Sequence, residues 1–198
     1  KLMVLKCYEN CIIWLPELST NLRVINCSEN FLQFLPPSMP QYLYKLSCAG
    51  NNIHSIPDEM LENLTRLKVF DCSSNDLISA PRLPPKLIIY YCGENKFKTV
   101  QVPQPQSLKV FDCNGNPWDK DNLPTLFKAV EASGAQNATE VFFGGAKTVA
   151  LLSEAAKNID GTARETLVGA LGSLAELAGH RVTQGIVERI VPKKKARS

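Results

Sequence analysis

The residues of this 198-residue sequence with the widest choice of chemistry are its seven cysteines. They lie at Cys7, Cys11, Cys27, Cys48, Cys72, Cys92 and Cys113. A thiolate can bind a metal, act as a nucleophile or form a disulfide, and each use requires particular partners close by. When Cys11 is set aside, the gaps between successive cysteines are 20, 21, 24, 20 and 21 residues. This regularity predicts an internal repeat with cysteine at a fixed position, and not a disulfide framework.

The partners that reactive cysteines need are scarce in this chain. The histidines are His54 and His180, and no Cys-x-x-Cys pair occurs, so we expect no metal site. Gly-rich phosphate loops and a Gly-x-Ser-x-Gly motif are also absent from the sequence. We therefore expect no catalytic residue, no cofactor and no enzymatic activity in this segment. The repeated cysteines are interpreted as small buried hydrophobic residues, and their free thiols suit a reducing compartment.

The cysteines belong to a longer repeated pattern, Leu-x-x-Leu-x-Cys-x-x-Asn, in which the second Leu can be another large apolar residue. It occurs at six consecutive places, with ladder residues Cys7, Cys27, Cys48, Cys72, Cys92, Cys113, Asn10, Asn30, Asn51, Asn75, Asn95 and Asn116. Each match predicts a short strand whose Leu and Cys side chains enter a shared core. Each Asn predicts hydrogen bonds to backbone groups of neighbouring turns. One repeat cannot bury its own apolar face, but six stacked repeats can.

In the segments that return from one strand to the next, an apolar residue is followed by proline, as in Leu15-Pro16 and Ile56-Pro57. A period of 20 or 21 residues leaves little room for a helix, and proline blocks one. We therefore expect an extended convex side. The third repeat, which is 24 residues long, has room for about one helical turn after Pro57, capped by Asp58 or its neighbours.

These features form the leucine-rich-repeat signature. The segments Leu67–Asn75, Leu108–Asn116 and Leu83–Leu87 resemble bacterial repeats of the LPX type, and the resemblance covers roughly residues 1–118. It implies an α/β leucine-rich-repeat solenoid with short parallel strands on the concave face and an extended convex side.

The resemblance also implies an effector that a bacterium secretes into the host cytosol, where it binds a host protein. Some related effectors carry a ubiquitin-ligase domain in which a Cys is followed two residues later by Asp. No Cys-x-Asp occurs here, so the catalytic domain of such a ligase would lie outside this segment.

Three columns of the strand pattern should face solvent on the concave side. The residues expected to bind a partner there are Tyr44, Lys68, Val69, Asp71, Ile88, Ile89, Tyr91, Lys109 and Asp112. β-Branched residues suit any strand, which is one explanation of the apolar middle column. The alternative is an apolar stripe flanked by charge, as in a protein-binding surface. Because acidic residues lie among the basic ones, we do not expect nucleic acid to bind.

The composition changes after Trp118, where the Leu-Pro returns end and Ala and Gly become frequent. Residues 1–118 are predicted to be a repeat domain that lacks an N-terminal part, and residues 119–198 a C-terminal helical segment. Helices are expected over about 122–132, 137–158 and 162–190, the second with Asn137 and Glu140 as a capping box.

The first of these helices could cap the last repeat. The other two could pack against that cap, begin another domain or associate with a second copy. The basic stretch Lys193–Arg197 is either a solvated end or a targeting or membrane-binding segment. No apolar run is long enough for a transmembrane helix, and the oligomeric state is left open.

Overall fold

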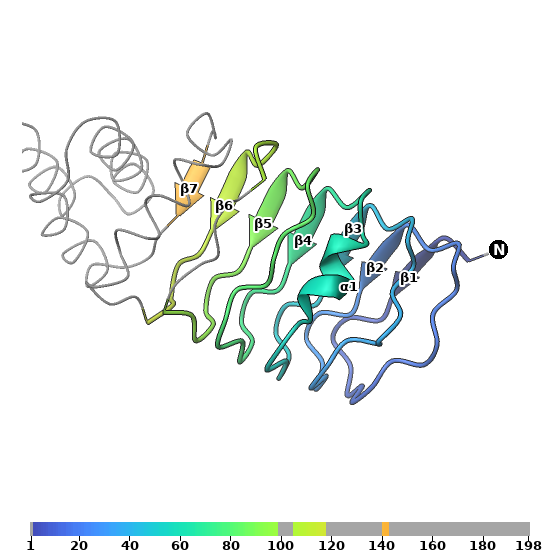
Figure 1. Cartoon of the computed structure of the whole chain (residues 1–198). Coiled ribbons are helices and arrows are strands. Elements are labelled where there is room, and N and C mark those ends of the chain that lie inside the picture. Colours follow the sequence, from blue (N-terminus) through green and yellow to red (C-terminus); the bar gives the residue numbers. More distant parts are fainter. Residues whose placement is uncertain (1, 99–104, 118–139, 143–198) are drawn as a thin grey trace, which may run out of the picture.

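Seven short parallel strands and one helix are present in residues 2–98, 105–117 and 140–142, which a computed structural model describes. The elements are β1 (Val4–Lys6), β2 (Val24–Asn26), β3 (Lys45–Ser47), α1 (Asp58–Glu62), β4 (Val69–Asp71), β5 (Ile89–Tyr91), β6 (Val110–Asp112) and β7 (Glu140–Phe142). They form one sheet in which each strand pairs with its neighbours in the sequence, so the chain advances as a solenoid (Figure 1). The predicted solenoid of parallel strands is confirmed.

Equivalent positions of the repeats pair across the sheet. Ile25 in β2 lies opposite Leu5 on one side and Leu46 on the other. A strand of three residues turns its middle side chain to one face and the two flanking side chains to the other. In β2 the middle residue is accordingly buried, whereas Val24 and Asn26 are half-buried. The register thus stacks the repeated apolar positions in the interior and leaves two columns outside.

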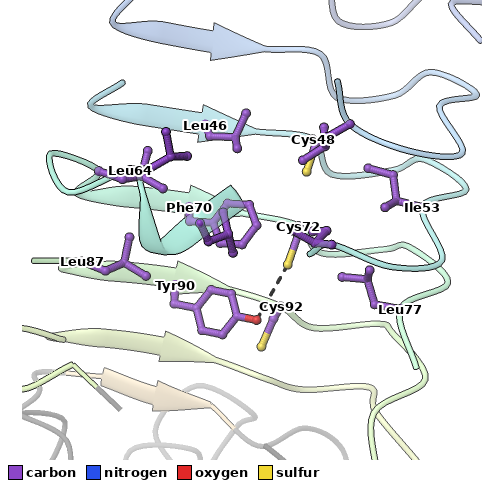
Figure 2. Close-up of a cluster of buried hydrophobic side chains, with 14 of the residues drawn as sticks. Leu46, Cys48, Ile53, Leu64, Phe70, Cys72, Leu77, Leu87, Tyr90 and Cys92 are labelled. Atoms are coloured by element: carbon purple, nitrogen blue, oxygen red, sulfur yellow. Dashed lines mark hydrogen bonds between the residues drawn. The ribbon is translucent and has the colours of Figure 1, made fainter. Parts of the chain in front are cut away.

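Aromatic rings fill the interior of the later repeats. Phe70, Tyr90 and Phe111 are buried at equivalent positions of β4, β5 and β6, and neighbouring rings stack with centroids 5.7 Å apart. Figure 2 shows Phe70 and Tyr90 side by side, with the Tyr90 hydroxyl directed at the cysteine column. The Cys72 thiol donates a weak hydrogen bond to this hydroxyl at 3.9 Å. The parallel register lets three planar side chains pack as one column.

The asparagine ladder satisfies backbone groups between the turns. The Asn30 amide nitrogen donates to the carbonyls of Cys7, Cys27 and Ser28 at 2.9, 3.1 and 3.0 Å. Its side-chain oxygen accepts the Ile12 N–H at 2.9 Å. The same four types of bond recur around the ladder asparagines of the next repeats. From Asn30 onward, one buried side chain therefore replaces water for four backbone groups in each turn.

The first repeat departs from this pattern because β1 pairs with β2 alone in the described sheet. Cys7 is only half-buried and Asn10 is exposed, whereas the later ladder residues are buried. The expectation that all six ladder cysteines are buried is therefore wrong for Cys7. The reason is its position, since a side chain at the end of a stack has a neighbouring turn on one side only.

The return segments are non-helical in the described repeats except in the longest, which contains α1. Its position agrees with the helical turn expected after Pro57, but the expected cap is wrong. The residue that precedes the helix is Pro57, and it makes no side-chain capping bond. The Asp58 carboxylate instead accepts the backbone N–H of Arg82 at 2.7 Å. The helix is therefore held by the next repeat and not by a cap of its own.

Strand β7 corrects the prediction for the C-terminal segment. A helix was expected over 137–158, but Glu140–Phe142 extends the sheet and pairs in parallel with β6. Two physical reasons favour the strand. The edge of β6 offers unpaired N–H and C=O groups, and the sequence Val141-Phe142-Phe143 has high β-propensity. The helices expected over 122–132 and 162–190 and the basic stretch Lys193–Arg197 lie outside the described residues.

Candidate protein-binding surface

Of the nine residues expected to bind a partner, five are outward-facing strand residues, namely Val69, Asp71, Ile89, Tyr91 and Asp112. Val69 and Ile89 pair between β4 and β5, and Tyr91 lies in register with Asp71 and Asp112. The others come directly before β3 to β6, and they are Tyr44, Lys68, Ile88 and Lys109. We call the strand face the outward side chains of β1 to β6 together with the residue that precedes each strand. The register thus gathers side chains from four repeats on one surface.

Backbone hydrogen bonds hold the first column of this surface. The N–H of Lys68 donates to the Tyr44 carbonyl at 2.9 Å. The N–H of Ile88 donates to the Lys68 carbonyl at 2.9 Å, and that of Lys109 to the Ile88 carbonyl at 2.8 Å. Side chains in this column are therefore fixed at their base, and little backbone ordering is needed when a partner binds.

The aromatic and aliphatic residues of the strand face differ in exposure. The Tyr44 side chain is 54% exposed, whereas Ile88, Ile89 and Tyr91 are half-buried by their neighbours in the columns. Tyr44 therefore offers the larger free area, and Tyr91 offers a ring that is already positioned. Both properties suit contacts in a protein interface, where aromatic residues contribute most.

Two carboxylates flank Tyr91 on the strand face. Asp71 accepts the Ser73 hydroxyl at 2.6 Å, and Asp112 accepts the Asn114 side-chain amide at 2.6 Å. Burial raises the pKa of the Asp112 carboxyl, and the nearby negative charge of Asp71 also raises it. The hydrogen bonds from Asn114 act in the opposite direction and lower this pKa. The charge around Tyr91 is therefore negative and partly desolvated.

A further acidic row lies where each strand ends, and the sequence reasoning missed it. The residue before each ladder asparagine has a positive φ in all six repeats: Glu9, Glu29, Gly50, Ser74, Glu94 and Gly115. Glutamate rarely adopts this conformation, yet it does so in three of these turns. The Ser74 hydroxyl donates to the Glu94 carboxylate of the next turn at 2.6 Å. A column of Glu and Gly at one repeat position was the signal that could have identified this row.

Exposed aromatic residues of the first two repeats were also missed. Trp14 and Phe34 occupy the same position of successive repeats, beyond the asparagine ladder, and are both 58% exposed. Phe31 and Ile13 are exposed in the same part of the chain. This apolar area lies off the strand face, and any test of the strand face must be able to distinguish the two.

The cysteines lack the environment of reactive thiols. The Cys27 and Cys48 thiols donate to the carbonyls of Ser47 and Asp71, each at 3.4 Å. Burial, with the nearby Cys7 thiolate as a smaller cause, raises the pKa of Cys27 to about 12. All seven cysteines are free, and Cys11 is exposed. In the part of the chain that the structure describes, no group of three His, Cys, Asp or Glu side chains could hold a metal ion.

Comparison with known proteins gives relatives for the repeats. No family model matches the chain. Mouse oligodendrocyte-myelin glycoprotein is 31% identical over 100 residues, which is 49% of this chain and 23% of that protein. Mouse podocan is 29% identical over 111 residues, 42% of this chain and 18% of that protein. Mouse nephrocan is 31% identical over 101 residues, 49% of this chain and 20% of that protein. The chain thus spans less than a quarter of the length of each.

Among solved structures, the leucine-rich effector protein YopM from Yersinia pestis is similar, with a TM-score of 0.45 and 23% identity. The similarity covers 61% of this chain and 40% of YopM.

The geometry of the repeat decides its class. Six successive strands carry the Leu-x-x-Leu-x-Cys-x-x-Asn pattern in register, and each ladder Asn after Asn10 bonds backbone groups of its own and neighbouring turns. The described turns are leucine-rich repeats. In these leucine-rich repeats cysteine occupies the third core position, which explains why it recurs without any reactive partner. No helix in the described leucine-rich repeats is long and apolar enough to cross a membrane.

Proposed function

We propose that this chain is a protein-interaction module that binds its partner through the strand face, the concave face of the solenoid. The observation that carries the proposal is the register, which supports one continuous surface of half-buried apolar side chains and charged side chains. Leucine-rich repeats in general provide scaffolds of this kind. The chain itself binds and does not catalyse.

Rigidity favours such a use of the surface. Association costs free energy for every side chain and loop that becomes ordered. On this sheet the backbone is already fixed by hydrogen bonds to both neighbouring strands, and Tyr91 is flanked by side chains of β4 and β6. A partner therefore needs to order little more than its own contacting side chains.

The experiment is a titration of the Tyr91→Ala variant with the protein captured from host-cell lysate by the unmodified chain. We expect binding to weaken by about 2 kcal/mol, close to thirtyfold, because a positioned aromatic ring near the middle of an interface contributes strongly. The fold should be unaffected, since the Tyr91 side chain lies on the outer face while Tyr90 enters the core. Circular dichroism checks that the variant is folded.

Two matched variants make the result specific. Ile78→Ala removes an apolar side chain that is 71% exposed outside the strand face, and it should leave the affinity unchanged. Trp14→Ala removes the largest aromatic ring of the other exposed apolar area. If Trp14→Ala abolishes binding while Tyr91→Ala has no effect, the strand face is not the binding site.

We further propose that the partner is a host protein and that the chain acts in the host cytosol as a secreted bacterial effector. The LPX-type returns and the free thiols support this assignment. As an alternative, the same surface would recognise the substrate of a ubiquitin ligase whose catalytic domain lies outside this segment. A ubiquitin discharge assay tests the claim, common to both, that this segment does not catalyse, because thioester formation on one of the seven cysteines would contradict it.

A further inference from the structure

A tyrosine at the amino end of the strands is clamped by two arginines. The guanidinium carbon of Arg23 lies 4.7 Å from the centroid of the Tyr42 ring, and that of Arg66 lies 4.8 Å from it. Because the repeats stack in chain order, Arg23 approaches from the side of β2 and Arg66 from the side of β4. Both contacts have the geometry of cation–π interactions. The Arg23 guanidinium also donates to the carbonyls of Asn21 and Leu22, at 3.1 and 3.4 Å.

The charges of this clamp are not balanced inside the described repeats. Neither Arg23 nor Arg66 forms an ion pair with a carboxylate there, whereas Arg82 pairs with Asp58 and Glu62, each at 3.5 Å. Two cations that share one aromatic ring repel each other. An anionic group placed between them would relieve this repulsion and would meet guanidinium groups that stacking has already oriented.

The clamp is the centre of a wider basic edge, which we call the amino rim. Its members lie within one residue of the first leucine of their repeats and are Arg23, Arg66, Lys68, Lys86 and Lys109. The Lys68 ammonium donates to the Lys86 carbonyl at 3.1 Å, which holds this side chain at the rim. The same two columns contain no Asp or Glu in any of the described repeats.

The opposite edge of the strand face has the opposite charge. This carboxyl rim consists of Glu9, Glu29, Asp71, Glu94 and Asp112, with Lys6 as an exception. A strand advances by about 3.3 Å per residue, and the rims are offset by at least three residues within a repeat, as are Lys68 and Asp71, so the rims lie at least about 10 Å apart. This separation exceeds the Debye length of about 8 Å at physiological ionic strength, so a ligand at one rim is largely screened from the other. The strand face is thus polarised from a basic edge to an acidic edge.

We propose that the amino rim around Tyr42 binds an acidic peptide segment of the partner protein, through its Asp and Glu side chains. The inference rests on the proposed function, because it assigns a chemistry to one edge of the same surface. A shallow hollow of about 290 Å³ adjoins the ring and is lined by Thr20, Ser38, Gln41 and Tyr42 among others, so polar side chains are available for a peptide backbone. A long polyanion such as RNA fits less well, because its phosphates would also meet the carboxyl rim.

The experiment measures fluorescence anisotropy of a labelled oligoglutamate peptide, with the matched oligoglutamine peptide as the uncharged control. Oligoglutamate should bind with an affinity that falls as salt is raised, and oligoglutamine should not bind. Arg66→Gln should weaken the binding of oligoglutamate about tenfold, because it removes a charge-assisted hydrogen bond. Tyr42→Leu should weaken it about threefold, because both arginines lose the ring that orients them.

Arg82→Gln is the matched control, because it makes the same substitution at an arginine that already has carboxylate partners. It should bind oligoglutamate as the unmodified chain does. The proposal is overturned if Arg66→Gln binds normally, or if Arg82→Gln loses as much affinity as Arg66→Gln. It is also overturned if a single-stranded oligonucleotide binds more tightly than oligoglutamate with the same dependence on Arg66.

The Tyr91→Ala variant separates this proposal from the proposed function. It should bind oligoglutamate normally, because Tyr91 lies at the carboxyl rim among Asp71 and Asp112. If oligoglutamate fails to bind while the captured partner still depends on Tyr91, the amino rim proposal is wrong and the strand face stands. If oligoglutamate binds through Arg66 but the captured partner binds Tyr91→Ala as tightly as the unmodified chain, the amino rim is supported and the strand face proposal is wrong.

Discussion

A single ladder asparagine shows how much one residue can contribute in a solenoid. The Asn75 amide donates to the carbonyls of Cys48, Cys72 and Ser73 at 3.0, 3.1 and 3.0 Å. Its oxygen accepts the Ile53 N–H at 3.0 Å. Without this side chain, four polar backbone groups would have to find other partners in a region that water does not reach.

Asn75→Ala should therefore lower the free energy of unfolding by at least about 3 kcal/mol, because each buried polar group left without a partner costs about 1–3 kcal/mol. Asn10→Ala at the exposed end should cost about 1 kcal/mol or less, since water can replace its two bonds to carbonyls. Urea unfolding of both variants measures the difference. Equal costs for the two positions would show that burial does not determine the strength of the ladder.

Asp112 makes the stability depend on pH. Burial raises the pKa of its carboxyl above the ordinary value of 3.8, and the charges of Asp71 and Glu94 act in the same direction. The folded protein therefore holds this proton more tightly than the unfolded chain does, and ionisation above pH 3.8 destabilises the fold. The Asp112→Asn variant keeps an oxygen that can accept the hydrogen bonds of Asn114 but carries no charge.

Asp112→Asn should thus change the free energy of unfolding little near pH 3, where aspartate is mostly protonated in both states, and should raise it at about pH 7. Urea unfolding at the two pH values gives the comparison. A variant that is less stable than the unmodified chain at neutral pH would mean that the hydrogen bonds from Asn114 outweigh burial.

At the scale of the element, β7 closes the described sheet. Without it, β6 would present unpaired N–H and C=O groups and the edge of the Phe111 layer. Phe142→Pro should disrupt this pairing, because alternate residues of a parallel strand bond the same neighbour, the N–H of Phe142 faces β6, and proline has no N–H to donate. We expect the amides of β6 to exchange with solvent at least about tenfold faster, since the change costs about 1.4 kcal/mol or more of local stability.

Hydrogen exchange followed by mass spectrometry gives this measurement, with Phe142→Ala as the matched variant that keeps the N–H. Exchange in β2 and β3 should be unchanged, because each repeat contacts only its neighbours. If Phe142→Pro leaves the protection of β6 intact, β7 does not stabilise the last repeat.

For the molecule as a whole, stability follows position along the stack. Leu5 and Leu46 occupy the same position of the first and third repeats, but Leu46 is fully buried and Leu5 is half-buried. Leu46→Ala should cost about 2–5 kcal/mol, as expected for a buried leucine, and Leu5→Ala should cost less. The measurement is urea unfolding of both variants, and similar losses would contradict the one-dimensional stack.

The sequence by itself determined the repeat. The period of Leu, Cys and Asn was sufficient to predict six strands, their parallel order and the asparagine ladder, because each of these depends on which residue types recur at which spacing. The non-helical returns and the short helix followed from proline and from the longer third repeat. In the same way, Val69, Ile89 and Tyr91 could be assigned to one surface, since alternation along a strand is a local property.

Only the tertiary structure decided the features that depend on neighbouring turns. The burial of Cys7 depends on its place at the end of the stack, and a capping box at Glu140 could not reveal that β6 offers a free edge. The clamp joins Arg23, Tyr42 and Arg66, which come from three successive repeats, so no local sequence pattern predicts it. A solenoid brings distant residues together by stacking its turns, and which side chains meet depends on how those turns pack.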